Sequence, residues 1–197
     1  MMLATDPQPK ISTPAEYLAL EEVATERHEY RNGAIVQMTG ATTDHNQICL
    51  NFVSVFKAAL RGQGYRIFMT DVKVKIPDYS IYTYPDLLIV QGQPVYEGEK
   101  KLVVLNPYAI VEVLSESTQS YDRGEKFFYY RSLPSLQEYI LIDQYSYHLE
   151  QYVRQGSDRW LLRLYDGAAS KLEFGSLPLA IAAADLYEEV EFPAEGE

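Results

Sequence analysis

Two short apolar segments, each interrupted by one carboxylate, constrain the fold of this chain more than any other feature. Asp86 lies in the segment YPDLLIV, and Glu112 lies in the segment YAIVEVLS. Apolar runs of this length, rich in β-branched residues, are typical of buried strands. Because side chains alternate along a strand, we expect Glu112 to share one face with Ile110 and Leu114. The sequence therefore predicts two acids set into the core of a β-sheet.

These two buried acids need a partner. An ionised carboxylate on an apolar face costs on the order of several kcal/mol unless a cation or hydrogen-bond donors compensate it. Two acids on neighbouring strands are a common way to hold a hard divalent cation. The structural alternative is that Asp86 and Glu112 cap loops or pair with arginine, as other buried acids do.

The segment after Glu112 adds a lysine to this set. Ser120 or Asp122 can cap a helix that runs to about Ser132, and Asp122 and Lys126 stand one turn apart on it. Two acids with a lysine suit metal-dependent hydrolysis of a phosphodiester. The cation lowers the pKa of a bound water and neutralises charge on the phosphate, and a lysine stabilises the transition state.

Composition is compatible with an intracellular enzyme. The chain has 197 residues and a net charge of −11, with a sequence pI near 4.8. This excess of negative charge counts against non-specific binding to nucleic acid. A bound metal ion can nevertheless make the electrostatic potential positive at a site. The single cysteine, Cys49, permits no intrachain disulfide and fits a reducing compartment, and residues 1–10 have no targeting pattern. We expect a cytoplasmic protein without a membrane segment.

The order of predicted elements indicates a single α/β domain with a mixed sheet, over residues 13–190. We expect a disordered segment at 1–12 and an acidic tail at 191–197. A capping box at Thr13 begins a helix that runs to about residue 22. Asn32-Gly33 predicts a hairpin that pairs Glu29 with Val36.

The further expected elements begin with a helix at 43–61 capped by Thr43. Strands are expected at 65–76, 84–90, 108–115 and 138–143. An antiparallel meander at 147–154, 160–165 and 171–174 follows, and then a short helix within 179–191.

Two further residues stand out beside apolar neighbours. Glu29 lies on the same face of the predicted hairpin as Val36, and an ion pair with Arg27 or Arg31 is the structural alternative. His45 falls on the apolar stripe of the 43–61 helix, where a histidine is more often a hydrogen-bonded core residue than a ligand. Asp71 has lysines as same-face neighbours, so we give it no catalytic role.

Other catalytic patterns are missing from the sequence. Three histidines and one cysteine do not form a zinc-binding cluster. No phosphate-binding glycine-rich loop follows a strand, and there is no Gly-x-Ser-x-Gly elbow.

The ordered motifs resemble those of the Uma-two family of endonucleases. The motifs are YPDL with Asp86, IVEVLSEST with Glu112, DRGEK with Lys126 and EYILID further on, preceded by EYRNG, MTG and His45. The resemblance covers roughly residues 13–174. It implies the restriction-endonuclease-like fold of the PD-(D/E)XK nucleases, a mixed β-sheet flanked by helices.

The resemblance also implies roles for matching residues. Asp86 and Glu112 match the two acids that bind Mg²⁺ or Mn²⁺. Most members of the superfamily place lysine two residues after the second acid, but this chain has Leu114 there, so the lysine function is expected to move to Lys126. Glu29 resembles an extra catalytic acid from the amino-terminal region, and His45 matches a characteristic position of the family.

From the residues and the resemblance together, we predict a Mg²⁺-dependent endodeoxyribonuclease. Its catalytic residues would be Asp86, Glu112, Lys126 and Glu29, with His45 as an additional site residue. Nucleic acid, and specifically DNA, would be its partner. Nucleases of this type often act as homodimers that cut both strands, so a homodimer is a further expectation. The rival hypothesis is an inactive protein of nuclease fold that uses the same pocket to bind a partner.

Overall fold

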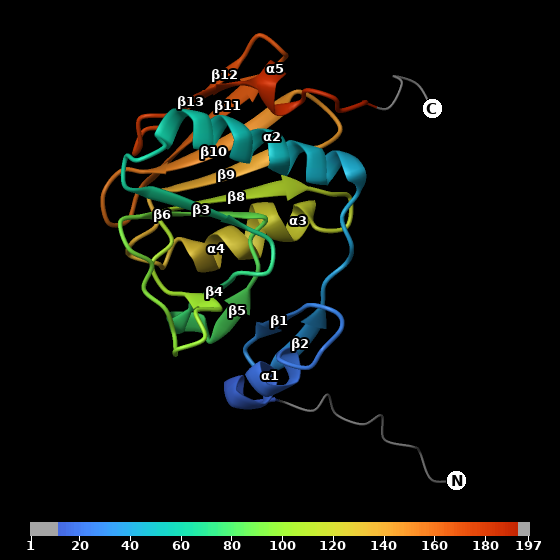
Figure 1. Ribbon diagram of the computed structural model, residues 1–197, viewed down its shortest axis with the longest axis vertical. Coiled ribbons are helices and arrows are strands. Elements are labelled where there is room, and N and C mark those ends of the chain that lie inside the picture. The colour runs from blue at the N-terminus through green and yellow to red at the C-terminus, as the bar shows by residue number, and fades with distance from the viewer. Residues whose placement is uncertain (1–11, 193–197) are drawn as a thin grey trace.

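The structure is a computed structural model that describes residues 12–192, and it contains three β-sheets with helices packed on both faces of the largest (Figure 1). The helices are α1 (Pro14–Glu21), α2 (Thr43–Leu60), α3 (Gln119–Tyr121), α4 (Phe127–Tyr130) and α5 (Ala183–Leu186), with a 3₁₀ turn at Pro77–Tyr79 and a π-helical turn at Asp122–Lys126. The strands are β1 (His28–Arg31), β2 (Ala34–Gln37), β3 (Tyr65–Met69), β4 (Lys73–Ile76), β5 (Ile81–Thr83), β6 (Leu87–Gln91), β7 (Val103–Val104), β8 (Ala109–Leu114), β9 (Glu138–Asp143), β10 (His148–Arg154), β11 (Trp160–Asp166), β12 (Lys171–Glu173) and β13 (Ala180–Ala182).

The largest sheet has six strands in the order β11-β10-β9-β8-β6-β3. Strands β8 and β9 are parallel and are connected through α3, the π-helical turn and α4, while the other neighbours are antiparallel. Strand, helical segment and strand thus form a parallel crossover unit, which gives the mixed sheet that the sequence predicts. Strands β6 and β8 are direct neighbours, with Leu87 opposite Val111. The two acid-bearing segments therefore lie side by side at the centre of the sheet.

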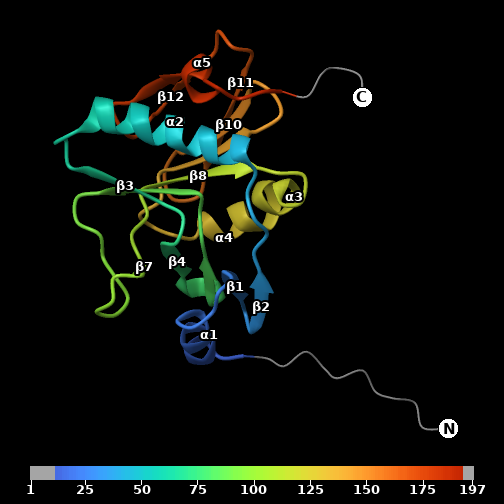
Figure 2. The same ribbon diagram turned by 45° about the vertical axis from the view of Figure 1, so that its right-hand side comes forward.

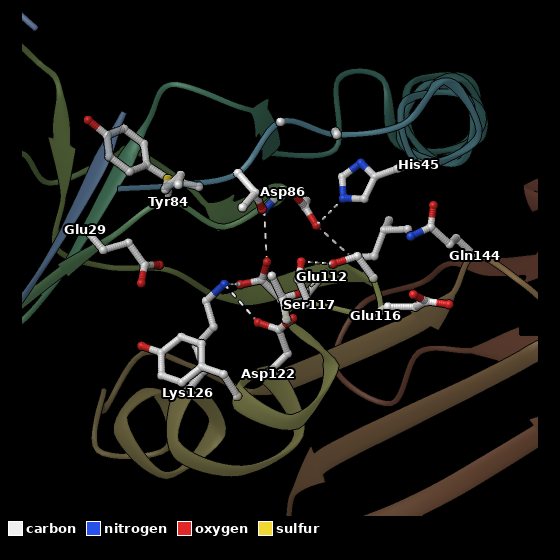
Figure 3. A pocket seen from close by; sticks show the side chains of 18 of the residues that line it. Glu29, His45, Tyr84, Asp86, Glu112, Glu116, Ser117, Asp122, Lys126 and Gln144 are labelled. Atoms are coloured by element: carbon white, nitrogen blue, oxygen red, sulfur yellow. Dashed lines mark hydrogen bonds and ion pairs between the residues drawn. The ribbon is translucent and has the colours of Figure 1, made fainter. Parts of the chain in front are cut away.

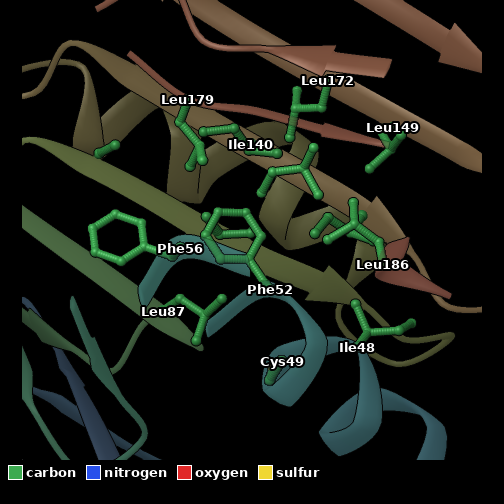
Figure 4. Packing of buried hydrophobic residues seen from close by; sticks show 14 of the residues in the cluster. Ile48, Cys49, Phe52, Phe56, Leu87, Ile140, Leu149, Leu172, Leu179 and Leu186 are labelled. Atoms are coloured by element: carbon green, nitrogen blue, oxygen red, sulfur yellow. The ribbon is translucent and has the colours of Figure 1, made fainter. Parts of the chain in front are cut away.

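The two faces of this sheet pack against different helices. On one face, Ile48 and Phe52 of α2 contact a core that includes Val111 and Val113 of β8 (Figure 4). On the other face, Ile110 and Leu114 of β8 belong to the core that contains Tyr130 of α4, together with side chains of β4 and β5. The predicted alternation along β8 is confirmed. Glu112, on the face of Ile110 and Leu114, points toward the α3–α4 side.

The smaller sheet has the order β2-β1-β5-β4-β7, and with α1 it lies on the side of the large sheet away from α2 (Figures 1 and 2). Its first hairpin has the predicted register, with Glu29 opposite Val36. The capping box that begins α1 is also confirmed, since Thr13 and Glu16 bond reciprocally. Tyr17 of α1 packs between Tyr30 and Tyr82, with ring centroids 5.4 and 5.6 Å away. This aromatic cluster fixes the hairpin to the rest of the molecule.

Two predicted elements differ in the structure. The expected strand at 65–76 is two strands in different sheets, because Thr70 and Asp71 adopt φ values of +47° and +28° and turn the chain between β3 and β4. The expected three-stranded meander ends after β11, since β12 pairs with β13 in a separate sheet. β13 and α5 occupy the stretch where a short helix was expected.

Two helix starts were also placed wrongly. The side chain that caps α2 is Thr42, not Thr43, and its hydroxyl accepts from the N–H of His45 at 3.1 Å. The helix after β8 begins at Gln119, so neither Ser120 nor Asp122 is its cap, and its middle is a π-helical turn. Single-turn π segments inside helices often occur at functional sites.

Residues at both ends of the described range, 12 and 192, contact the rest of the molecule. Most of the expected disordered segment and acidic tail, residues 1–11 and 193–197, lies outside the described residues. Ser12 donates its N–H to the Gly33 carbonyl at 2.9 Å, and Phe192 packs on Tyr147. Between residues 12 and 192, no helix has both the length and the apolar character needed to cross a bilayer.

Candidate active site

A cavity of about 580 Å³ opens between the first hairpin, the start of α2 and the helical segment after β8 (Figure 3). The five residues singled out in the sequence all line it: Glu29, His45, Asp86, Glu112 and Lys126. They come from β1, α2, the residue before β6, β8 and the π-helical turn. The fold thus brings together residues that are up to 97 positions apart, from Glu29 to Lys126. Their roles in catalysis stay a prediction.

Asp86 and Glu112 are both held by main-chain N–H groups of the two neighbouring strand segments. Asp86 Oδ2 accepts the N–H of Val113 at 2.7 Å, and Glu112 Oε2 accepts the N–H of Asp86 at 3.3 Å. This exchange follows from the antiparallel pairing of β6 and β8, which sets the two acids across from one another. The Asp86 side chain is 23% exposed, whereas Glu112 is only 2% exposed. The contacts of the Asp86 carboxylate leave its Oδ1 without a hydrogen-bond partner among the described residues.

Lys126 neutralises part of this acidic group. Its Nζ lies 2.8 Å from Glu112 Oε1 and 3.2 Å from Asp122 Oδ1, and its side chain is 8% exposed. Burial by itself lowers the pKa of Lys126, but Glu112 and Asp122 outweigh burial and hold that pKa well above its usual value. The amine therefore stays charged. It reaches the face of Glu112 from the next helix, on the side where β8 carries Leu114.

Two residues that sequence analysis did not assign to the site complete the surroundings of Glu112. Asp122 was expected as a helix cap but is buried at 3% exposure and pairs with Lys126 instead. Tyr130 donates its hydroxyl to Glu112 Oε1 at 3.1 Å. The four-residue spacing of Asp122 and Lys126 was a usable signal for the first. Tyr130 had none, because a tyrosine in a helix usually indicates packing.

Glu29 is held away from the other acids by its own partners. Its carboxylate accepts two N–H groups from Arg31, at 2.9 Å from Nε and 2.5 Å from Nη2, and the hydroxyl of Thr83. The structural alternative stated from the sequence, a pair with Arg31, is thus present. Glu29 is 3% exposed and lines the cavity, but among the described residues its carboxylate bonds to Arg31 and Thr83 and not to Asp86 or Glu112.

Arg31 is a site residue that the sequence analysis considered only as a partner of Glu29. Its guanidinium carbon lies 3.7 Å from the centroid of the Tyr121 ring, so the group lies over that ring while Nε and Nη2 at its edge donate to Glu29. Its side chain is 31% exposed and lines the cavity, and Nη1 has no hydrogen-bond partner among the described residues. Arg31 therefore presents a fixed cation with an available donor, the geometry that suits a phosphate.

His45 contacts Asp86 directly. Its Nε2 lies 3.1 Å from Asp86 Oδ2, the oxygen that also accepts from Val113. Burial lowers the pKa of His45, but the hydrogen bond and charge of Asp86 outweigh it and raise that pKa above 6.5. The apolar stripe of α2 positions this histidine one turn before Ile48, as expected. Its contact is nevertheless polar and faces the cavity.

The charge of the site fits a divalent cation. Asp86, Glu112 and Asp122 are three carboxylates with one lysine between them. Burial raises the pKa of Glu112 well above its usual value, and Asp86 and Asp122 add to this against the opposing effect of Lys126. In the described residues no group of three or more His, Cys, Asp or Glu side chains has metal-binding geometry. Asp86 and Glu112 would thus supply two oxygens, which suits Mg²⁺, since it usually keeps several waters beside one or two carboxylates.

The sequence matches one family model and is similar to two proteins of a cyanobacterial strain. Residues 14–183 match the model of the family Uma2, described as "Putative restriction endonuclease". "Uncharacterized protein sll1609" of Synechocystis sp. (strain ATCC 27184 / PCC 6803 / Kazusa) is 37% identical over 179 residues, which are 91% of this chain and 99% of that protein. "Uncharacterized protein slr1290" of the same organism is 34% identical over 186 residues, or 94% and 96% of the two chains.

A solved structure confirms the fold class. It is the crystal structure of "a putative nuclease belonging to DUF820 from Anabaena variabilis ATCC 29413". It matches with a TM-score of 0.74 at 19% identity, over 89% of this chain and 97% of that chain. The expected restriction-endonuclease-like arrangement, a mixed sheet flanked by helices, is therefore correct.

Proposed function

The chain belongs to the Uma2 family, and from this membership and the geometry of the cavity we propose that it is a metal-dependent endonuclease that hydrolyses phosphodiester bonds in DNA. The observation that carries the proposal is the coupling of Asp86 and Glu112. Each carboxylate accepts a main-chain N–H beside the other, and Lys126 lies 2.8 Å from Glu112. Two strands therefore hold two acids and a cation in one fixed arrangement.

In this proposal Asp86 and Glu112 hold Mg²⁺ or Mn²⁺. When bound, the ion would supply an acidic water and neutralise charge that develops on the phosphate. Val113 N–H and His45 fix Asp86 Oδ2, which leaves Oδ1 directed at the ligand. Tyr130 and Lys126 fix Glu112 Oε1. Such support from neighbouring groups holds ligands in place before the ion arrives.

Lys126 and Arg31 supply positive charge from the protein itself. An ammonium group has three donors, and the two carboxylates next to Lys126 can engage two of them. The third can be donated to a phosphate oxygen in the transition state. Arg31 binds a neighbouring phosphate through Nη1, while Glu29 fixes its orientation. Glu29 is thus a positioning acid in this proposal, in agreement with its two hydrogen bonds from Arg31.

The direct test is the nicking of supercoiled plasmid DNA in Mg²⁺ or Mn²⁺. The wild-type protein should nick the plasmid, and EDTA should stop the reaction. Asp86→Ala should lower the rate by at least about a hundredfold, because it removes one of the two carboxylates proposed to hold the metal. The matched control is Asp78→Ala, an exposed acid in the 3₁₀ turn outside the cavity.

Two results would contradict the proposal. Nicking that persists at the wild-type rate in Asp86→Ala would show that the activity does not come from this site. An absence of cleavage with either metal, together with an absence of metal binding, would favour the rival hypothesis of a nuclease fold that serves as a binding module.

A further inference from the structure

A second cavity, of about 370 Å³, lies on the other side of Asp86. It shares a wall with the first cavity, formed by residues 38–41, His45, Tyr84 and Asp86. A ligand whose reacting phosphate lies beside Asp86 therefore has a second compartment directly next to that phosphate. Cavities of this volume are in the range that holds a small organic group.

The second cavity has a largely apolar lining that includes polarisable side chains. Met38, Met69 and Cys49 supply sulfur-containing side chains, and Tyr84 supplies an aromatic ring. Thioether and aromatic groups pack well against the face of another ring. Tyr84 is held in place, since its hydroxyl donates to Glu21 Oε1 at 2.7 Å and the residue is 3% exposed. These sulfur-containing and aromatic side chains are therefore suited to contact with a planar group.

The charges around this cavity favour a neutral occupant. Arg27 is paired with Asp71 at 2.8 Å, and His45 is paired with Asp86 at 3.1 Å. The positive charges of Arg27 and His45 are thus balanced by Asp71 and Asp86, and Glu26 adds a negative charge that would repel a phosphate. In contrast, the side chains of Thr39 and Asn46 have no hydrogen-bond partner among the described residues. They offer donors and acceptors to a polar edge.

The rim of the cavity is strained where it contacts Asp86. Thr70 and Asp71 have positive φ values, which are unusual for a β-branched residue such as threonine. The N–H of Thr70 donates to the carbonyl of Asp86 at 3.2 Å, and Asp71 is fixed by Arg27. Residues held in such conformations cluster at ligand sites, where the surroundings hold them in place. The turn between β3 and β4 therefore lies directly beside Asp86.

We propose that this second cavity binds one unpaired nucleobase of the substrate strand, next to the phosphate that is cleaved. The proposal rests on the nuclease function proposed above and adds to it a preference for single-stranded or locally unpaired DNA. A base is planar, neutral and carries a hydrogen-bonding edge, and proteins commonly bind unstacked bases on aromatic and apolar surfaces. The backbone phosphates of the same strand would remain in the first cavity with Arg31 and Lys126.

The methionines provide a direct probe. The chain has four, and the two in the described residues, Met38 and Met69, both line the second cavity. Met69 lines only this cavity, whereas Met38 lies at the junction of the two. Methyl-¹³C-methionine protein is titrated with a short oligothymidylate and with an abasic sugar-phosphate oligomer of the same length and charge. Ca²⁺ replaces Mg²⁺, and the oligomers are checked for integrity after each titration.

The proposal predicts that the base-bearing oligomer shifts the Met69 methyl signal and that the abasic oligomer does not. Stacking is worth about 1–3 kcal/mol per base, so the abasic oligomer should bind at least about fivefold more weakly. Asn46→Ala should weaken only the base-bearing oligomer, by about fivefold. Ser54→Ala, a polar change on the exposed side of the same helix, should weaken neither.

The outcomes separate this inference from the function on which it rests. If both oligomers bind equally and move Met38 alone, the base does not enter the second cavity, and the inference is wrong while the nuclease proposal stands. If neither oligomer shifts either methyl signal, DNA does not bind here and both proposals fail. If the base-bearing oligomer shifts Met69 but plasmid is never cut, the base site is supported and catalysis is not.

Discussion

At the scale of single residues, the site is a group of buried charges whose stability depends on Lys126. Glu112 and Asp122 are both almost fully buried, and Lys126 is the cation between them. Removing one partner of a buried ion pair leaves an uncompensated charge, which costs about 3–5 kcal/mol. Lys126→Met is therefore expected to lower the free energy of unfolding by roughly that amount, measured by urea denaturation without added metal.

A second variant separates the loss of charge pairing from a loss of packing. In Lys126→Met/Glu112→Gln the carboxylate is neutral as well, so a large part of the lost stability should return. Lys57→Met, on the exposed last turn of α2, serves as the control and should change stability by less than about 0.5 kcal/mol. Equal destabilisation of the single and double variants would show that Lys126 stabilises the fold by packing rather than by charge.

Single residues also show how far a sequence can indicate a site. Asp86 and Glu112 stand out in the sequence because burying an ionised acid in an apolar strand costs free energy. Such an acid therefore indicates a compensating partner or a function. Lys126 was identified from the family resemblance and from its spacing to Asp122. Arg31 was seen only as a partner of Glu29, because nothing in the sequence shows that the first hairpin lies over the cavity. Such contacts between distant elements depend on the packing of the whole chain.

At the scale of elements, α2 connects the core to the site. Its buried side includes Phe52, which packs on the central sheet (Figure 4). Its first turn carries His45, which contacts Asp86 (Figure 3). Phe52→Ala should lower the free energy of unfolding by about 3–5 kcal/mol, because it leaves a cavity in the core. Denaturant unfolding followed by circular dichroism measures this loss.

The matched control for that variant is Leu50→Ala on the same helix. Leu50 is 45% exposed, so its truncation should cost less than about 1 kcal/mol. Similar losses for the two variants would contradict the assignment of the buried side of α2.

The elements that were predicted correctly carry strong local signals. The Asn32-Gly33 turn fixed the register of the first hairpin, and the Thr13 capping box fixed the start of α1. The break between β3 and β4 had no such signal. Thr70 and Asp71 replace the glycine or asparagine usual at positive φ, and the alternation of side chains continues across them. The π-helical turn at Asp122–Lys126 was equally hidden, since its residues fit an ordinary helix.

At the scale of the whole molecule, the net charge of −11 opposes the approach of any polyanion, so the proposed binding of DNA requires local attraction at the site. Arg31 and Lys126 are the arginine and lysine that line the first cavity, and a divalent cation would add two positive charges beside them. Binding of DNA should therefore depend on the metal. The homodimer suggested by the family resemblance stays a prediction.

Calorimetric titration of the metal-free protein with Mg²⁺ and Mn²⁺ shows whether Asp86 and Glu112 jointly bind a divalent cation. We expect one site per chain in the wild-type protein, with heat of binding lost in Asp86→Asn and in Glu112→Gln but retained in Asp78→Asn. Binding that is absent from the wild-type protein, or equal in the wild-type and Asp86→Asn proteins, would contradict it.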